Sequence, residues 1–308
     1  MPMPHRTQLQ VIKRRLVGKD GSARIAELRK ALAELPDYRN GPYADIRKWL
    51  LGQIEETRVR AKVVHRDTIS VRREGVAQIA FVGPPNAGKS SLLQALSEIQ
   101  IKTGDYAFTT LRPVASLTRI HGVLVQLVEI PGLIEGAHED RGGGRALLGV
   151  LRNADAIVLC QAADASLEGL TAVRAELEVA GIDLPAIVAV TKLDEVDDGA
   201  VARVSEELGL PALGVSILDD TSLDGLREAM WALTGLICVR LRHRGEDGGE
   251  PVALSPGATI ADVADEIHHE LAETCTGARI WGPSARFDGQ RVGRGHVVTD
   301  GDTVEVLT

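Results

Sequence analysis

Residues 83–90 read Gly-Pro-Pro-Asn-Ala-Gly-Lys-Ser and stand between two segments with different hydrophobic periodicity. The preceding run, QIAFV at 78–82, has the apolar character of a buried strand, and the following run, SLLQALSEI at 91–99, has helical spacing. A glycine-rich loop that joins a strand to the N-terminus of a helix directs backbone N–H groups toward phosphate. The sequence therefore predicts that this loop binds the phosphates of a nucleoside triphosphate.

Individual residues of the loop have expected roles at the triphosphate. We expect Lys89 to bridge the β- and γ-phosphates and the Ser90 hydroxyl to ligate Mg²⁺. The alternative interpretation, a glycine-rich turn that contains Gly-Lys-Ser by chance, is disfavoured by the strand before it and the helix after it. The other residues predicted to bind the nucleotide here are Gly83, Asn86, Ala87, Gly88 and Ser91.

Short apolar runs alternate with helical stretches on the C-terminal side of the loop. Continuous apolar strands separated by helices indicate a mostly parallel sheet covered on both faces, the α/β class. Ligands in such folds bind beyond the carboxyl ends of the strands, and the motifs described below lie at those ends. The predicted strands are 78–82, 123–130, 156–160, 186–190 and 212–216.

The start of the chain is basic and lacks this alternation. Residues 1–76 contain 17 Lys and Arg against 9 Asp and Glu, whereas the rest of the chain contains 18 against 34. Helical spacing of apolar residues at 22–35, and again from 46 towards 61, predicts an amphipathic α-helical hairpin. A basic region is compatible with docking on RNA and equally with solvated helix faces. We assign 1–76 to a basic helical region and 77–236 to the P-loop domain.

The pattern changes again near residue 236. Two predicted strands precede a helix that begins at Thr259, where Asp262 completes a capping box, and two more strands follow that helix. This order predicts a small mixed sheet with one helix packed across it, an additional domain of ubiquitin-like size at 237–308. The four strand candidates are ICVRLR, EPVALS, ARIW and TVEVLT.

The sequence Thr-Lys-Leu-Asp at 191–194 follows the fourth predicted strand and indicates the base. The carboxylate of Asp194 is expected to accept from guanine N1–H and the exocyclic amine, a donor pair that adenine lacks. The Lys192 stem is expected to lie along the base plane. The usual motif begins with Asn, and Thr191 keeps a hydroxyl but loses the amide that braces the neighbouring loops. The residues whose N–H groups are predicted at the guanine carbonyl are Ser216 and Ile217.

Glu129-Ile-Pro-Gly132, at the end of the second predicted strand, is expected to meet the metal and the γ-phosphate. A carboxylate here holds Mg²⁺ through water, and the glycine N–H senses the γ-phosphate. The common residue is Asp, so the longer Glu129 either adjusts the metal shell or weakens Mg²⁺ binding. Thr110 is the candidate for the second metal-ligating hydroxyl, with Thr109 as the alternative. The residues expected to act in catalysis are Lys89, Thr110 and Gly132.

Together, GPPNAGKSS, YAFTTLRP, EIPGLIEGAHEDRGGGR and TKLD closely resemble the Obg-related GTPases, in particular the developmentally regulated GTP-binding (DRG) group. PGATIADVADEIH and DGDTVEV are similar to the β-grasp TGS domain of that group, so the resemblance extends from about residue 77 to residue 308. Eukaryotic and archaeal members insert a small domain before the guanine motif. This chain lacks it, because GIDLP at 181–185 runs almost directly into the next strand.

The resemblance implies a protein that hydrolyses GTP to GDP and phosphate as a slow molecular switch. Leu133 stands where many small GTPases carry a water-orienting Gln, and an aliphatic side chain cannot polarise water. In related GTPases with this substitution, K⁺ bound by the P-loop Asn supplies positive charge, and Asn86 matches that residue. The implied cofactors are Mg²⁺ and, through Asn86, K⁺. The implied partner is the ribosome or a structured RNA, with a protein regulator as a further candidate.

Two other functions stay open on the sequence. One is a non-hydrolysing guanine-nucleotide sensor or scaffold, which Glu129, Thr191 and Leu133 together favour. The other is an Obg-like ATPase, against which Asp194 argues because that carboxylate selects guanine.

The cysteines and the apolar runs indicate a compartment. No apolar run reaches the roughly 20 residues that a bilayer span requires, and the N-terminus lacks the apolar stretch of a signal peptide. We therefore expect a cytoplasmic protein without a membrane partner. The three cysteines form no CxxC pair and are interpreted as reduced core thiols; they are Cys160, Cys238 and Cys275.

Overall fold

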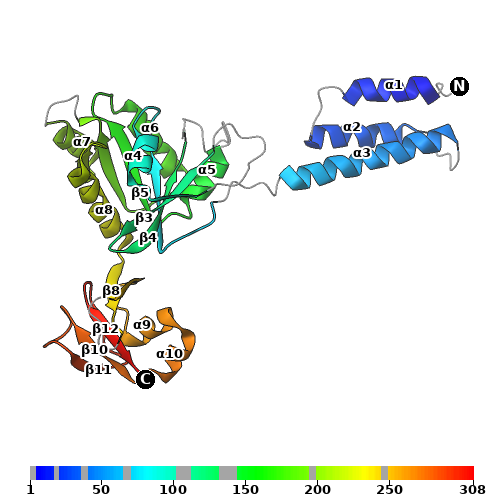
Figure 1. Cartoon of the computed structure of the whole chain (residues 1–308). Helices are drawn as coiled ribbons and strands as arrows, with labels where there is room; N and C mark the ends of the chain where they lie inside the picture. The colour runs from blue at the N-terminus through cyan, green and yellow to red at the C-terminus, as the bar shows by residue number, and fades with distance from the viewer. Residues whose placement is uncertain are drawn as a thin grey trace. The chain divides into compact units, whose positions relative to one another are not determined.

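The structure is a computed structural model of the whole chain (Figure 1). It divides into two compact units, Met1–Thr68 and Ile69–Thr308, and each is considered by itself. The residues that the structure describes are 5–16, 21–35, 41–64, 71–101, 112–131, 144–193, 199–243 and 249–308.

The N-terminal unit contains the helices α1 (His5–Leu16), α2 (Gly21–Ala33) and α3 (Pro42–Val64). Helices α2 and α3 correspond to the hairpin that the sequence predicts. Helix α1 is not among the predicted elements, because its sequence is mostly polar and its apolar stripe is narrow. The buried residues that the three helices share are Ile12, Leu16, Leu28, Ala31, Leu35, Ile46, Leu50 and Ile54.

A seven-stranded sheet forms the first part of the second unit. Its strands are β1 (Ala77–Val82), β2 (Ile99–Ile101), β3 (Val114–Ile120), β4 (Val123–Glu129), β5 (Ala156–Ala162), β6 (Ala186–Thr191) and β7 (Ala212–Val215). They lie in the order β2-β3-β4-β1-β5-β6-β7, and β4, β1, β5, β6 and β7 are parallel. The mostly parallel α/β sheet predicted from the apolar runs is confirmed.

Strand β3 is missing from the predicted set. Its sequence VASLTRI places Ser, Thr and Arg among the apolar residues and so lacks a continuous apolar run. It is nevertheless buried over most of its length, because it pairs antiparallel with β4 from Val114 to Ile120. The strand therefore depends on its partner more than on its own sequence.

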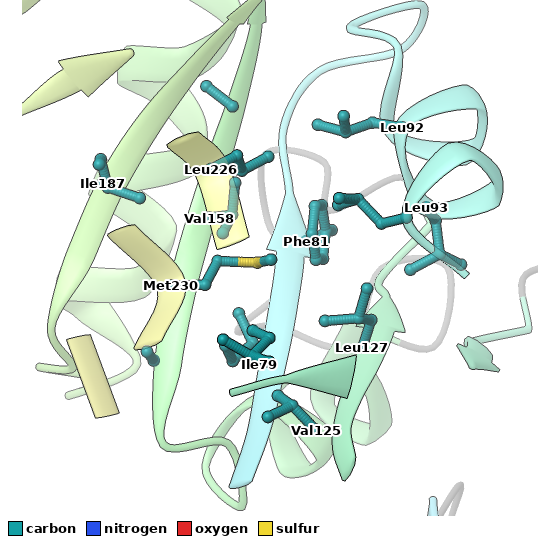
Figure 2. Packing of buried hydrophobic residues seen from close by; sticks show 14 of the residues in the cluster. Ile79, Phe81, Leu92, Leu93, Val125, Leu127, Val158, Ile187, Leu226 and Met230 are labelled. Carbon is teal, nitrogen blue, oxygen red and sulfur yellow. The ribbon is translucent and has the colours of Figure 1, made fainter. Parts of the chain in front are cut away.

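Helices cover both faces of this sheet (Figure 1), and each face has its own hydrophobic cluster. The helices are α4 (Lys89–Leu96), α5 (Gly144–Leu151), α6 (Glu168–Val179), α7 (Ala200–Leu208) and α8 (Asp220–Thr234). In β1, Ala80 and Val82 belong to the cluster with α5, α6 and α7, whereas Ile79 and Phe81 belong to the cluster with α4 and α8. Figure 2 shows Phe81 beside Leu92 and Leu93 of α4. The central strand is thus buried on both sides.

The C-terminal part of this unit has a five-stranded sheet in the order β11-β10-β12-β8-β9. Its elements are β8 (Ile237–Leu241), β9 (Glu250–Leu254), α9 (Ile260–Ile267), α10 (His269–Thr274), β10 (Gly277–Trp281), β11 (Gln290–Gly293) and β12 (Thr303–Leu307). Helix α9 packs on one face, with Ile260, Val263 and Ala264 against strand residues such as Ile280. The carboxylate of Asp262 accepts from Thr259 N at 2.7 Å, so the predicted capping partner is confirmed.

The turn of the β3–β4 hairpin lies against α8 and the C-terminal sheet. His121 and Gly122 both have positive φ, of 51° and 89°. His121 Nε2 lies 3.1 Å from a carboxylate oxygen of Glu228, and Cys238 Sγ donates to the His121 carbonyl at 3.6 Å. A Cβ atom on Gly122 would approach Pro251 Cγ to 2.7 Å. These contacts therefore hold the turn in place, at the end of the hairpin opposite to the carboxyl ends of β1 and β4.

Candidate functional site

The phosphate-binding loop leaves β1 and leads directly into α4. Asn86 and Gly88 both adopt left-handed backbone angles, with φ of 63° and 78°. A Cβ atom on Gly83 would lie 2.3 Å from the Cys160 carbonyl oxygen, and one on Gly88 would lie 3.0 Å from Thr191 Oγ1. Alternating left-handed residues turn successive N–H groups into one concavity. Glycine is therefore required by the close approach of β5 and β6 to the loop.

Lys89 is held inside this loop. Only 7% of the residue is exposed, and its Nζ donates to the carbonyl oxygens of Gly83 at 2.9 Å and Pro84 at 2.8 Å. Burial lowers the pKa of Lys89, while Cys160 and Glu129 oppose that change. The ammonium group thus lies across the loop with two neutral acceptors, which a phosphate group can replace.

Cys160 lies beneath the loop and belongs to its packing. The residue is fully buried, and burial raises the pKa of its thiol to about 12. It is therefore a neutral thiol at physiological pH, as expected for a reduced core cysteine. Cys238 and Cys275 are also free and buried.

Ser90 and Glu129 meet at the ends of α4 and β4. The Ser90 hydroxyl donates to Glu129 Oε1 at 2.7 Å, and Glu129 is only 8% exposed. The longer Glu side chain therefore reaches the position of the loop hydroxyl. A hydroxyl and a carboxylate are hard oxygen ligands that fit Mg²⁺. Among the residues described, no group of three or more His, Cys, Asp or Glu side chains could hold a metal.

Thr191 ties the end of β6 to the phosphate-binding loop. Its Oγ1 donates to the Ala87 carbonyl at 3.0 Å and lies 3.4 Å from the Gln161 carbonyl, and the residue is 6% exposed. Lys192 follows with a positive φ of 58°. The hydroxyl alone thus supplies a contact between the two loops, although the amide of the usual Asn is absent.

Ser216 already has an internal partner. Its backbone N–H donates to Ser222 Oγ at 3.0 Å, and its own hydroxyl accepts from Leu218 N at 3.2 Å. Ile217, by contrast, is half exposed after the end of β7. These bonds stabilise the loop. They also occupy the Ser216 N–H, which the sequence predicts to contact the guanine carbonyl.

Gln161 is a site residue that the motifs do not reveal. It is fully buried at the end of β5, and its Nε2 donates to the carbonyls of Ala162 and Ala165 at 3.0 Å and 3.1 Å. The loop that it shapes leads to Gly169, where a Cβ atom would meet Pro84 at 3.0 Å. The signal in the sequence was a single polar residue in an apolar run.

The structure brings the described site residues together at one edge of the sheet, where β1, β4, β5 and β6 end. This is the edge at which parallel sheets bind ligands. The predicted residues Thr109, Thr110, Gly132, Leu133 and Asp194 lie outside the described residues.

Comparison with known proteins identifies two regions. Residues 78–192 match the family model described as 50S ribosome-binding GTPase, and residues 246–308 match the TGS domain. The predicted TGS domain is therefore confirmed. In the part of the chain that the structure describes, no helix has the length and apolar character needed to cross a membrane.

Several curated proteins are similar over most of the chain. An uncharacterized GTP-binding protein of Halobacterium salinarum is 30% identical, covering 77% of this chain and 85% of that protein. Developmentally-regulated GTP-binding protein 2 of Homo sapiens is 23% identical, and ribosome-interacting GTPase 1 of Saccharomyces cerevisiae is 25% identical; each covers 77% of this chain and 84% of the relative. Among solved structures, the G domain of the T. maritima FeoB iron transporter covers 51% of this chain and 98% of that structure, with a TM-score of 0.41 and 22% identity.

Proposed function

Because this chain belongs to the family of TGS-containing GTP-binding proteins that includes the developmentally regulated GTP-binding proteins, we propose that it hydrolyses GTP to GDP and phosphate as a slow molecular switch. The observation that carries the proposal is the convergence of Lys89, Ser90, Glu129 and Thr191 at one sheet edge. In this proposal residues 77–236 form the GTPase domain, 237–308 the TGS domain and 1–76 a basic helical region.

Phosphate binding follows from the loop. Lys89 exchanges the Gly83 and Pro84 carbonyls for oxygens of the β- and γ-phosphates, so its charge moves little when the nucleotide binds. N–H groups of the loop donate to the β-phosphate, and the helix dipole of α4 adds to their effect. Positioning and electrostatics are the main means by which proteins accelerate phosphoryl transfer.

Magnesium is assigned to Ser90, directly, and to Glu129, through water, with Thr110 as the third protein group. When bound, Mg²⁺ neutralises the charge that develops on the phosphate oxygens. The 2.7 Å hydrogen bond between the Ser90 hydroxyl and Glu129 Oε1 supports this assignment, because it holds the two oxygen atoms next to each other. Gly132 is assigned to sensing the γ-phosphate through its N–H.

Guanine recognition is assigned to Asp194, with the Lys192 stem along the base. Thr191 supports this base site indirectly, because its hydroxyl donates to the Ala87 carbonyl and so ties the end of β6 to the phosphate-binding loop. Because the Ser216 N–H already donates to Ser222, we assign the contact with the guanine carbonyl to the Ile217 N–H. The proposed nucleotide-binding set also includes Gly83, Asn86, Ala87, Gly88 and Ser91.

Slow turnover is proposed from Leu133, which cannot orient water, and K⁺ stimulation is proposed through Asn86. Asn86 adopts a left-handed backbone conformation, which Asn tolerates better than most residues other than glycine. K⁺ would add positive charge beside the phosphates.

The proposed partner is the ribosome or a structured RNA in the cytoplasm, with a protein regulator of the switch. The name of the yeast relative, ribosome-interacting GTPase 1, and the excess of Lys and Arg in residues 1–76 both support this assignment. Polyanion binding through such a segment weakens steeply with salt.

The test is GTP turnover by the purified full chain with Mg²⁺, in matched KCl and NaCl buffers and with and without ribosomes. We expect slow phosphate release that is faster in K⁺. Equal rates in the two salts contradict the role of Asn86. Tight GTP binding without any turnover, even with ribosomes, contradicts the proposed switch and favours a guanine-nucleotide sensor. If ATP competes for the site as well as GTP does, the role of Asp194 in selecting guanine is contradicted.

A further inference from the structure

The C-terminal sheet has one face that α9 does not cover. In β10, Ala278 and Ile280 are fully buried beneath the helix, while the alternate residues Arg279 and Trp281 point to the opposite face. A shallow depression of about 610 Å³ opens on that face, and the residues that line it include Arg242, Arg279, Trp281, Arg291 and Glu305.

The strand register concentrates positive charge in this depression. Arg279 lies directly opposite Arg291 in β11 and directly opposite Glu305 in β12. Like charges directly opposite each other are unfavourable in a sheet, and the Glu305 carboxylate lies opposite Arg279 but not opposite Arg291, so it offsets only part of that repulsion. A bound anion between the two guanidinium groups removes that repulsion.

A flat aromatic surface lies beside these charges. The guanidinium carbon of Arg242 is 4.5 Å from the centroid of the Trp281 ring, and the backbone at Gly289 approaches the edge of the same indole. Arg242 stacked on Trp281 thus presents a planar cation. Nucleic-acid bases stack on aromatic rings and on guanidinium planes, whereas carboxylates of an acidic peptide need no such plane.

The opposite side of the domain is acidic, and this fixes the direction of approach. Helices α9 and α10 expose the carboxylates of Asp262, Asp265, Glu266, Glu270 and Glu273. A polyanion is therefore repelled from the helical face and attracted to the uncovered sheet face.

We infer that the uncovered face of the C-terminal sheet binds a single-stranded segment of RNA. In this surface Arg279 and Arg291 bind phosphates, and the Trp281–Arg242 pair stacks a base. Arginine provides planar, multidentate contacts with phosphate. The inference deepens the proposed function, on which it rests, by naming a part of the chain besides residues 1–76 that contacts the RNA.

The first test measures affinity of the nucleotide-free full chain for a fluorescein-labelled, unstructured RNA of about 12 nucleotides, within the usual site sizes of such surfaces. Fluorescence anisotropy is recorded at several salt concentrations. In the double variant Arg279→Gln/Arg291→Gln, the slope of log affinity against log salt should decrease by about 1.4, since each phosphate contact contributes about 0.7 for single strands. The matched control is Arg203→Gln, an exposed arginine of α7. An unchanged slope in the double variant, or an equal change in the control, overturns the inference.

The second test separates stacking from charge. Trp281→Leu should weaken RNA binding about 10-fold without changing the salt slope, and Trp281→Phe should restore most of the affinity, because stacking is lost in the first and kept in the second. RNA should also quench the indole fluorescence of the parent chain more than that of Trp281→Phe. Equal affinity of the Leu variant and the parent chain overturns the role of Trp281.

A third variant changes affinity in the opposite direction. Glu305→Gln removes the carboxylate beside Arg279 and should tighten RNA binding about two- to five-fold at low salt, a result that misfolding cannot produce. Weaker RNA binding by this variant overturns the inference. Oligoglutamate that competes as strongly as unlabelled RNA of equal charge also overturns it, in favour of an acidic peptide. GTP turnover is measured in parallel. If the chain binds RNA but does not turn over GTP, the proposed switch is refuted while the RNA-binding surface is supported.

Discussion

The two sheets of the second unit expose different parts of the chain to ligands. The seven-stranded sheet is covered by helices on both faces, so its proposed ligand site lies at the ends of the strands, in the loops that follow them. The C-terminal sheet is covered on one face, and its open face carries side chains at alternate positions. A doubly covered sheet therefore depends on loop geometry for recognition, whereas a singly covered sheet depends on strand register.

The largest expected effect tests the burial that distinguishes the two sheets. Phe81 of β1 is fully buried and packs against α4 (Figure 2). Phe287, in the loop after β10, is 66% exposed. Phe81→Ala should lower the free energy of unfolding by about 3–5 kcal/mol, because it removes a buried ring and leaves a cavity. The matched variant Phe287→Ala should change it by less than about 0.5 kcal/mol. Urea unfolding of the full chain measures both, and similar losses would contradict the assigned burial.

Lys89→Ala tests whether the two ligand surfaces are separate. Removing one charge that clamps the phosphates should reduce GTP turnover by about 10²–10³-fold, while RNA binding to the nucleotide-free chain stays within two-fold of the parent. Phosphate release and RNA anisotropy measure the two activities, with Arg203→Ala as the charge control. A parallel loss of both activities would show that the surfaces are not independent.

Thr191→Val tests the contact between loops at the covered sheet. The change removes the donor to the buried Ala87 carbonyl and should weaken GDP binding about 10-fold, equivalent to about 1.4 kcal/mol. Thr191→Ser keeps the hydroxyl and should bind within about three-fold of the parent. Titration with a fluorescent GDP analogue measures the difference, and equal affinities for the Val and Ser variants would rule out the tether.

Asp262→Asn tests the covered face of the C-terminal sheet and should have the smallest effect. Hydrogen bonds from Thr259 lower the pKa of Asp262, so its contribution to stability is present above the pKa of the unfolded carboxyl and is lost as pH falls through the folded value. We expect a loss of about 0.5 kcal/mol at neutral pH, because the group is exposed. The difference from the parent should begin to shrink as pH falls below about 4, the ordinary value for the unfolded carboxyl, and should vanish only below the lowered pKa of the folded state. Asp288→Asn, which removes the same charge from an exposed loop, should have no comparable effect.

The features that the sequence predicted correctly are those encoded by neighbouring residues. β1, β4, β5 and β6 appear as continuous apolar runs, because each is buried on both faces. Strand β3 and helix α1 were not predicted, since their burial comes from partners that their own composition does not indicate. The loop between β1 and α4 was likewise predicted, because Gly-Lys-Ser stands next to the strand and the helix that it joins.

The contacts within the site were harder to predict. The tether from Thr191 to Ala87 joins residues 104 positions apart, and the position of a hydroxyl relative to a distant carbonyl depends on the packing of β6 beside the loop. The bond between Ser216 and Ser222 is equally invisible, because it depends on the start of α8. The sequence shows that Thr191 keeps a hydroxyl without the amide, but it does not show that this hydroxyl reaches the Ala87 carbonyl.

The β3–β4 hairpin links the proposed nucleotide site to the C-terminal sheet. Its two strands run side by side from the turn at His121 and Gly122 to Glu129, which touches the loop serine. Its turn meets Pro251 and Cys238 of the C-terminal sheet. One continuous pair of strands therefore connects the carboxylate beside Ser90 with the turn that contacts the C-terminal sheet, so both ends belong to the same hydrogen-bonded ladder.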